Sequence, residues 1–283
     1  MTAEGGPIEI GGATIDIVHP PNDPDFPRAL ASGWITTAAR AVTKYYGRFP
    51  VEHLVIRIRP VIGDRIESGK TFGTRDGGVI TVSVGRSTTA EHFHSDWLMT
   101  HEMVHLAFPS VADEHHWIEE GLATYIEPIA RARIGNLTAR EVWSDVVRDL
   151  PQGLPEADDR GLDFTPTWGR TYWGGALFCL LADVEIHRRT GNAKGLEDAL
   201  RAVLQAGGSI SADWDLERAL RTGDRATGVP VLEELYTKMR ASPHPVDLAQ
   251  FWHQLGIERR GSTLVLKDDA PLASIRKSIL PEQ

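Results

Sequence analysis

Two histidines and a glutamate stand close together in one predicted helix, as His101-Glu102-Met103-Val104-His105. Residues four apart in an α-helix lie on one face, one turn apart. His101 and His105 can therefore reach one metal ion, and two imidazoles suit zinc at Zn–N distances of about 2.0–2.1 Å. Glu102 lies about 100° round the helix from His101, so it can reach a water held by the metal without being a ligand. Zinc can lower the pKa of that water to about 7, and the carboxylate can then take its proton.

The surroundings of this motif favour a metal over a chance pattern. Chance alone produces H-E-x-x-H on the order of a few per cent of the time in a chain with 11 histidines. The apolar residues around the motif are Trp97, Leu98, Met99, Met103, Val104, Leu106 and Phe108. A helix that is apolar nearly all round is buried. Buried histidines and a buried glutamate are costly unless something satisfies them, and a metal ion does so.

The segments before and after the motif differ in the secondary structure that their sequences predict. Before the motif, alternating patterns predict a strand pair over 8–18 turning at Gly11-Gly12, strands over 54–58 and 79–84, and a helix over 28–46. The motif helix is predicted to begin at Thr88, with Glu91 completing a capping box, and to end at Phe108.

After the motif the chain reads as mostly helical. A helix begins near Asp113 and passes through Tyr125, and Pro128 ends, kinks or restarts it. Further helices are predicted at about 138–150, 170–190, 195–206, 213–221, 230–241 and 246–255, with a loop at 151–168 and a hairpin near 261–266. We therefore expect an α+β fold, with a mixed sheet layer followed by a helical lobe. The expected parts are an α+β subdomain at 1–109, a helical subdomain at 110–256 and a small β-hairpin or tail at 257–283.

Composition excludes several classes of protein. The chain has 283 residues, a formal charge of -9 and 41% hydrophobic residues, which are ordinary values for a soluble globular protein. It has no cluster of basic residues of the kind that binds nucleic acid, and no apolar stretch near the ~18 residues of a membrane span. The single cysteine, Cys179, lies in an apolar run and reads as core, so a disulfide scaffold and a cysteine-based zinc site are excluded.

The segment after the motif brings a resemblance to a known family. H-E-x-x-H followed by Trp117-Ile118-Glu119-Glu120-Gly121 resembles the gluzincin zinc metallopeptidases, most closely the aminopeptidase N and glycyl aminopeptidase families. The resemblance implies a thermolysin-like catalytic domain in which Glu120 is the third zinc ligand. Glu119 is the competing candidate. Independently, Gly121 removes a side chain beside that ligand and would let two helices approach closely.

One further residue follows from the same resemblance, and another from its position on the helix that carries Glu120. Tyr172-Trp173-Gly174-Gly175-Ala176 resembles a Y-x-x-G-A segment whose tyrosine donates a hydrogen bond to the oxyanion, which makes Tyr172 the candidate donor. The alternative is a tyrosine packed at a helix start. Glu127 lies on the Glu120 face and is either a carboxylate that orients a ligand histidine or a solvated charge.

The chain also departs from these families. Only 14 residues separate His105 from Glu120, fewer than in aminopeptidase N, which we interpret as a trimmed loop between helices. The segment whose glutamate grips a free amino terminus in aminopeptidase N has no counterpart here, so exopeptidase specificity does not follow. In related folds an edge strand pairs with an extended substrate, and the strand over 79–84 takes that place, or is a plain structural strand. His115 and His116 either line the cleft or have no role in it.

The sequence thus predicts a zinc-dependent peptidase that hydrolyses peptide bonds with Glu102 as general base. His101, His105 and Glu120 would hold the zinc, and Tyr172 would stabilise the oxyanion. Three alternatives remain: a zinc hydrolase of a non-peptide substrate on the same site, a catalytically silent peptide-binding protein, and a structural zinc protein with His115 or His116 as fourth ligand.

The sequence says less about the cellular location and the oligomeric state of the protein. The first residues, Met-Thr-Ala-Glu-Gly-Gly, show no basic n-region and no apolar h-region. We expect either a cytoplasmic protein or a mature exported one, and the resemblance favours an exported bacterial protein, periplasmic or secreted. The expected partner is a peptide or protein substrate, with no nucleic acid and no membrane insertion, and the sequence sets no oligomeric state.

Overall fold

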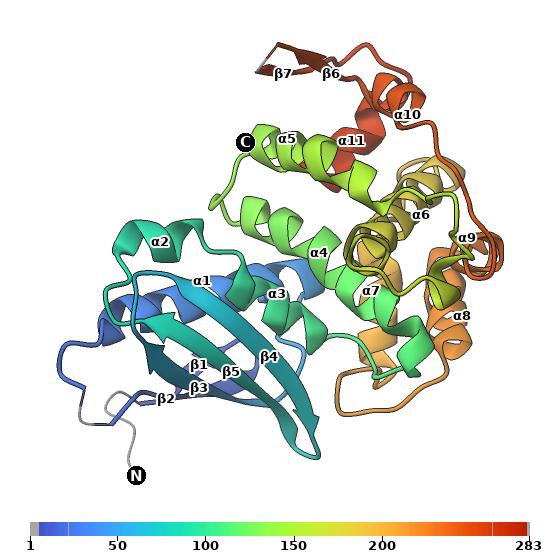
Figure 1. The fold of residues 1–283 in the computed structure, drawn as a ribbon. Coiled ribbons are helices and arrows are strands. Elements are labelled where there is room, and N and C mark those ends of the chain that lie inside the picture. The colour runs from blue at the N-terminus through green and yellow to red at the C-terminus, as the bar shows by residue number, and fades with distance from the viewer. Residues whose placement is uncertain (1–5, 22, 262, 282–283) are drawn as a thin grey trace.

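The N-terminal half of the molecule is built on one mixed sheet (Figure 1). The computed structural model describes residues 6–21, 23–261 and 263–281. The strands of the sheet are β1 (Ile8–Ile10), β2 (Ala13–Val18), β3 (His53–Val61), β4 (Ile66–Thr74) and β5 (Gly77–Gly85), in the order β1-β2-β3-β5-β4. Strands β2, β3 and β5 run parallel, while β1 and β4 pair antiparallel with β2 and β5. The strands predicted over 8–18, 54–58 and 79–84 are all present.

Alternation of side chains gives this sheet one apolar face. Ile15, Ile56 and Ile80 lie on neighbouring strands and are fully buried, whereas the next residues along each strand are more exposed. Successive side chains of a strand point to opposite faces. The helix α1 (Arg28–Tyr46) packs against α3 (Leu98–His105), which in turn contacts β4.

The edge strand is not the one predicted. Strand β5 pairs with β3 on one side and with β4 on the other, so the predicted edge strand over 79–84 is central and that interpretation is wrong. The edge strand next to β5 is β4, which was not predicted, and the opposite edge strand is β1. Its sequence carries Gly69 and Gly73 and lacks the run of β-branched and aromatic residues that signals a strand.

The predicted motif helix is interrupted. Helix α2 (Ala90–Ser95) begins after Thr89, whose side chain accepts from the His92 backbone N–H, so the cap is one residue later than predicted. The chain then leaves the helix at Asp96 before α3 begins. One carboxylate oxygen of Asp96 accepts from the Leu98 backbone N–H and from the Trp34 indole of α1. The Asp96 carboxylate thus bonds to the first turn of α3 and links the break between α2 and α3 to helix α1.

Helices make up most of the rest of the described chain. They are α4 (His116–Arg133), α5 (Ala139–Asp149), α6 (Gly175–Arg189), α7 (Leu196–Gln205), α8 (Leu216–Thr227), α9 (Val231–Met239), α10 (Leu248–Leu255) and α11 (Ala273–Ile279). Helix α4 continues through Pro128 without ending. The hairpin of β6 (Ile257–Arg260) and β7 (Thr263–Leu266) is present as predicted, whereas α11 was not predicted. Within the described ranges, no helix combines the length and the apolar character needed to cross a bilayer.

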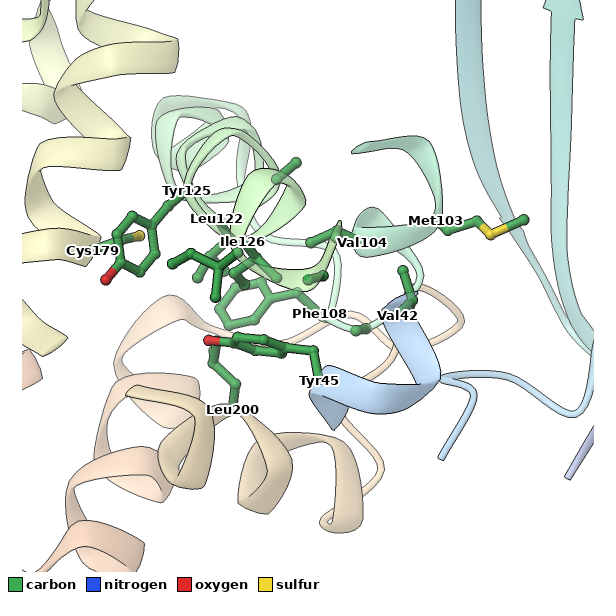
Figure 2. Packing of buried hydrophobic residues seen from close by; sticks show 14 of the residues in the cluster. Val42, Tyr45, Met103, Val104, Phe108, Leu122, Tyr125, Ile126, Cys179 and Leu200 are labelled. Carbon is green, nitrogen blue, oxygen red and sulfur yellow. The ribbon is translucent and has the colours of Figure 1, made fainter. Parts of the chain in front are cut away.

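A continuous apolar core joins the two parts of the molecule (Figure 2). Val42 of α1, Val104 of α3 and Ile126 of α4 are each at most 2% exposed. Cys179 of α6 is also fully buried, in agreement with its interpretation as core. Helices α3 and α4, which carry the H-E-x-x-H motif and Glu120, are therefore fixed relative to each other by packing.

Helices α4 and α6 approach so closely that no side chain fits between them at one point. A Cβ atom built on Gly121 would lie 2.4 Å from the Cα and carbonyl carbon of Gly175. A Cβ on Gly175 would lie 2.1 Å from the Trp117 carbonyl oxygen. Real Cβ atoms do not approach backbone this closely, so the expectation that Gly121 permits a close helix approach is confirmed.

The contact of Gly121 with Gly175 predicts that alanine at position 121 lowers the stability of the protein, whereas alanine at a glycine in an open part of a helix raises it. Gly121→Ala should lower the free energy of unfolding by about 1–3 kcal/mol, because the added methyl overpacks the interface. Gly33→Ala in α1 is the matched control, since nothing lies within 4 Å of its Cβ position. It should raise stability by about 0.5–1 kcal/mol through helix propensity. Urea unfolding followed by circular dichroism measures both, and a shift of the same sign in the two variants would contradict the packing argument.

Candidate metal centre and active site

The structure brings His101, His105 and Glu120 together. One possible ligand atom from each lies within 4.8 Å of the other two. Glu120 Oε2 is 3.1 Å from His101 Nε2 and 3.7 Å from His105 Nε2. The two imidazoles come from successive turns of α3, and the carboxylate reaches them from the first turns of α4. The three side chains that the sequence singled out as candidate ligands thus lie close together.

The chemistry of these donors fits a zinc ion. Burial, reinforced by the neighbouring His101, lowers the pKa of His105 to about 3, which keeps the imidazole neutral and able to ligate. Burial alone would raise the pKa of Glu120, but hydrogen bonds from His101 and His116 outweigh it and hold that pKa below its ordinary range. Neutral imidazole and ionised carboxylate are the protonation states that zinc binding needs. Two nitrogens and one oxygen also form a common catalytic zinc set.

The other candidate ligands are placed differently. Glu119 interacts with His116 Nδ1 at 3.1 Å instead of turning toward the two motif histidines. His116 Nε2 lies 3.4 Å from Glu120 Oε1, on the side of the carboxylate away from His101 and His105. His115 Nδ1 lies 3.0 Å from the buried Asp163 carboxylate, so this imidazole belongs to the packing beneath α4. Of the two histidines, only His116 lines the cleft.

Glu102 is buried beside the cluster of His101, His105 and Glu120, against strand β4. The Thr71 hydroxyl lies 2.5 Å from Glu102 Oε2 and 2.9 Å from the Glu102 carbonyl oxygen. Burial raises the pKa of Glu102 above its ordinary value, while the Thr71 hydroxyl and His101 partly oppose that shift. A carboxylate in this state accepts a proton more readily than one in water.

Sequence reasoning missed the part of β4 that meets Glu102. A Cβ on Gly69 would lie 2.6 Å from Glu102 Cγ, so a side chain at position 69 would force the Glu102 carboxylate to shift from its observed place. Gly69 and Thr71 are two residues apart and therefore face the same side of the strand. Gly73 shares that face, and its Cβ position is 2.3 Å from the Ile210 carbonyl oxygen. Glycines at two-residue multiples in a strand indicate close approach by another element, and this was the available signal.

Tyr172 reaches the site from a π-helical turn, Arg170–Gly174, that precedes α6. Its ring stacks over the His101 imidazole at 6.3 Å between centroids and 18° between planes. Burial, followed by the carboxylates of Glu120 and Glu102, raises the pKa of Tyr172 to about 12. The hydroxyl therefore stays protonated at neutral pH and can donate a hydrogen bond. Insertions of π-helix of this kind are frequent at functional sites.

A buried ion pair supports that π-helical turn. The Arg170 guanidinium lies 2.6 Å from an Asp159 carboxylate oxygen, and both side chains are almost inaccessible. Arg170 also donates to the Gly153 carbonyl oxygen. These contacts attach the segment that carries Tyr172 to the loop before it.

Glu127 is not a solvated charge. It is buried and accepts from Arg131 Nη1 at 2.9 Å, one helical turn further along α4. Burial raises the pKa of Glu127 to about 7 despite the nearby arginine. The interpretation as a surface residue is therefore wrong, and the carboxylate is paired inside the protein behind His101.

A cleft opens over these residues, between the sheet layer and the helical lobe. Its volume is about 590 Å³. Strand β4 forms one wall through residues 68–73, and α3 and the start of α4 form the floor and the other wall. His101, Glu102, His105, Glu120 and Tyr172 all line it. The five predicted site residues thus share a single solvent-accessible space.

Solved structures with a similar fold include zinc peptidases. The M1 zinc metallopeptidase from Deinococcus radiodurans matches with a TM-score of 0.53 and 16% identity, over 86% of this chain and 52% of that one. The same values hold for a mutant of that enzyme bound to a Tyr-Ser-Ala substrate. An aminopeptidase N family protein from Idiomarina loihiensis matches with a TM-score of 0.63 and 10% identity, over 89% of this chain and 49% of that one.

These likenesses are to the fold. This chain spans about half the length of the structures it resembles. No family model matches the sequence, and no curated protein does. The chain therefore has a mixed α+β fold, with a mixed sheet and a helical lobe, that resembles the domains of M1 zinc metallopeptidases.

Proposed function

We propose that this protein is a zinc-dependent peptidase of the gluzincin type, with a thermolysin-like catalytic domain. The observation that carries the proposal is the convergence of His101, His105 and Glu120 on one point of an open cleft, directly beside the buried Glu102. The fold shared with M1 zinc metallopeptidases supports it.

Three protein ligands would hold the zinc ion. His101 and His105 would contribute imidazole nitrogens, and Glu120 would contribute Oε2. Three ligands leave a coordination position open, which is typical of catalytic zinc sites and not of structural ones. When bound, zinc supplies the Lewis acidity that lowers the pKa of water and polarises a carbonyl group.

Glu102 would move the proton. The Thr71 hydroxyl occupies Oε2, which leaves Oε1 to take a proton from the attacking water. The missing side chain at Gly69 keeps space beside that oxygen. Because burial raises its pKa, Glu102 can hold the proton and then pass it to the nitrogen of the leaving amine.

Tyr172 would stabilise negative charge on the carbonyl oxygen of the substrate. Its hydroxyl is protonated and lies on the cleft side of His101. The rest of the π-helical turn fixes the ring in advance, so little reorganisation is needed when charge develops.

The free edge of β4 would align an extended substrate. An edge strand presents unpaired backbone N–H and C=O groups, and peptides bind such edges by adding a strand. Strand β4 forms the cleft wall opposite α4 and contacts Glu102. The role expected for 79–84 thus passes to β4 in this proposal.

Zinc content tests the ligand set before any substrate is known. Purified protein should contain about one zinc per chain after reconstitution at neutral pH, measured by elemental analysis. Glu120→Ala should lose it, because the third donor is removed. Glu119→Ala is the matched control and should keep it, since Glu119 interacts with His116 instead. Loss of zinc from the Glu119 variant alone would make Glu119 the ligand.

Substitution of Glu102 tests the proton transfer. Glu102→Gln should keep zinc and lower kcat by about 10²–10⁴-fold, the usual contribution of a general base. Hydrolysis is followed with a library of fluorogenic peptides, alongside ester and epoxide substrates. Retained peptidase activity in a zinc-loaded Glu102→Gln protein would rule out this mechanism. Turnover of the esters or epoxides alone would indicate a non-peptide substrate.

Removal of one hydroxyl tests the oxyanion donor. Tyr172→Phe should lower kcat by about 10²–10³-fold with little change in KM, because the hydrogen bond forms only as charge develops. Zinc content should be unchanged. A rise in KM of similar size, with kcat unchanged, would instead show that the Tyr172 hydroxyl contributes to binding of the substrate in the ground state.

A further inference from the structure

One histidine of the cleft has no role in the proposed reaction. His116 is the first residue of α4 and lines the cleft, and its side chain is 56% exposed. Both of its ring nitrogens nevertheless face carboxylates. Its Nδ1 lies 3.1 Å from Glu119 Oε2, and its Nε2 lies 3.4 Å from Glu120 Oε1. The imidazole is therefore held between two acidic side chains of its own helix.

The start of α4 fixes the place of this imidazole. Residues three and four apart in an α-helix are neighbours on its surface, so His116 can meet both carboxylates at once. Its two sequence neighbours are anchored to one buried side chain: His115 Nδ1 lies 3.0 Å from Asp163 Oδ1, and the Trp117 indole N–H donates to the same oxygen at 2.8 Å. The Asp163 side chain is only 2% exposed. The backbone on both sides of His116 is thus held from beneath, while its ring lies at the cleft.

The two oxygens of the Glu120 carboxylate have different partners. Oε2 lies 3.1 Å from His101 Nε2 and 3.7 Å from His105 Nε2. Oε1 instead faces His116 Nε2. Hydrogen-bond partners of a metal-binding side chain fix its orientation. The contact with His116 therefore keeps Oε1 turned away from the two motif histidines and leaves Oε2 to act with them.

His116 itself is not placed as a further ligand. Among the residues that the structure describes, the possible ligand atoms that lie within 4.8 Å of one another come from His101, His105 and Glu120. His116 is not part of that group, because its Nε2 meets the oxygen of Glu120 that the other two imidazoles do not contact. An imidazole in this place acts on the carboxylate.

We propose that His116 is a positioning residue for the third zinc ligand: by holding Oε1, it makes Glu120 bind zinc through Oε2 alone. Glu119 would in turn orient the imidazole through Nδ1. The inference rests on the zinc ligand set of the proposed function and deepens it. A glutamate that binds through one oxygen leaves the fourth coordination position open, as a catalytic zinc site requires.

Zinc affinity tests this role without any substrate. The dissociation constant of zinc is measured at neutral pH by competition with a chromophoric chelator. His116→Ala should raise it about 10–100-fold, the usual cost of removing a partner of a ligand side chain. His116→Gln should keep most of the affinity, because its amide N–H can still donate to Glu120 Oε1, although an amide is a poor zinc ligand. His253→Ala is the matched control: it removes an exposed imidazole outside the cleft and should change nothing.

Cobalt spectroscopy tests the coordination itself. Co²⁺ binds nitrogen and oxygen sites of the kind that zinc occupies, and its visible absorption weakens as the coordination number rises. In the His116→Ala protein, the released Oε1 should join Oε2 on the metal, so the visible bands should lose intensity. The His116→Gln protein should keep the spectrum of the unsubstituted protein. A histidine that only stabilised the fold would leave this spectrum unchanged, and circular dichroism checks that each variant is folded.

The outcomes separate this inference from the proposed function. Unchanged zinc affinity or an unchanged Co²⁺ spectrum in His116→Ala would overturn the positioning role. A His116→Gln protein that binds zinc as weakly as the alanine variant would also overturn it and make His116 a direct ligand. Unsubstituted protein that binds no zinc would refute the proposed function, and the inference with it. Weaker binding that glutamine restores supports the positioning role even if no peptide is hydrolysed, a result that would count against the peptidase proposal alone.

Discussion

The arrangement of the site depends on burying three ionisable groups in one place. Two imidazoles and a carboxylate lie between α3 and α4, where an unpaired charge would cost several kcal/mol. The arrangement is tolerable because burial lowers the pKa of His105 and keeps that imidazole neutral, and because the Glu120 carboxylate receives hydrogen bonds. It also requires α3 and α4 to hold a fixed separation. The apolar core on α1, α3 and α4 sets that separation, and the side-chain-free contact of Gly121 with Gly175 holds α4 against α6.

The fixed orientation of α3 also explains why strand β4 carries so little side-chain bulk where it meets Glu102. Glu102 follows His101 in α3, so orienting the two histidines toward α4 directs Glu102 toward β4. The strand accommodates it with a glycine at 69 and a hydroxyl at 71. A bulky residue at 69 would push the carboxylate back toward the ligands. The weak strand sequence of β4 is therefore a consequence of what must fit against it.

Features that depend on residues close together in the sequence were predictable, whereas features that depend on distant contacts were not. The spacing of His101 and His105 is a property of one helix turn, and the hairpin at Gly11-Gly12 is equally local, so both were predictable. The helix break at Asp96 depends on Trp34, which is 62 residues away in sequence. Strand β4 was hidden because contact with Glu102, and not strand propensity, selects its residues. Glu127 was ambiguous because its burial depends on how α4 packs.

The cleft combines two kinds of surface, and their distribution indicates how it would work. Polar groups converge at the centre, where Glu102, Glu120 and Tyr172 can fix the position of one reacting bond. Apolar side chains, among them Trp97, Phe108 and Ile210, line the cleft beside them. Apolar contact supplies affinity without requiring a particular backbone position, while few convergent polar groups set orientation. A substrate held through apolar contacts with its side chains would thus leave the polar groups free to act on its backbone.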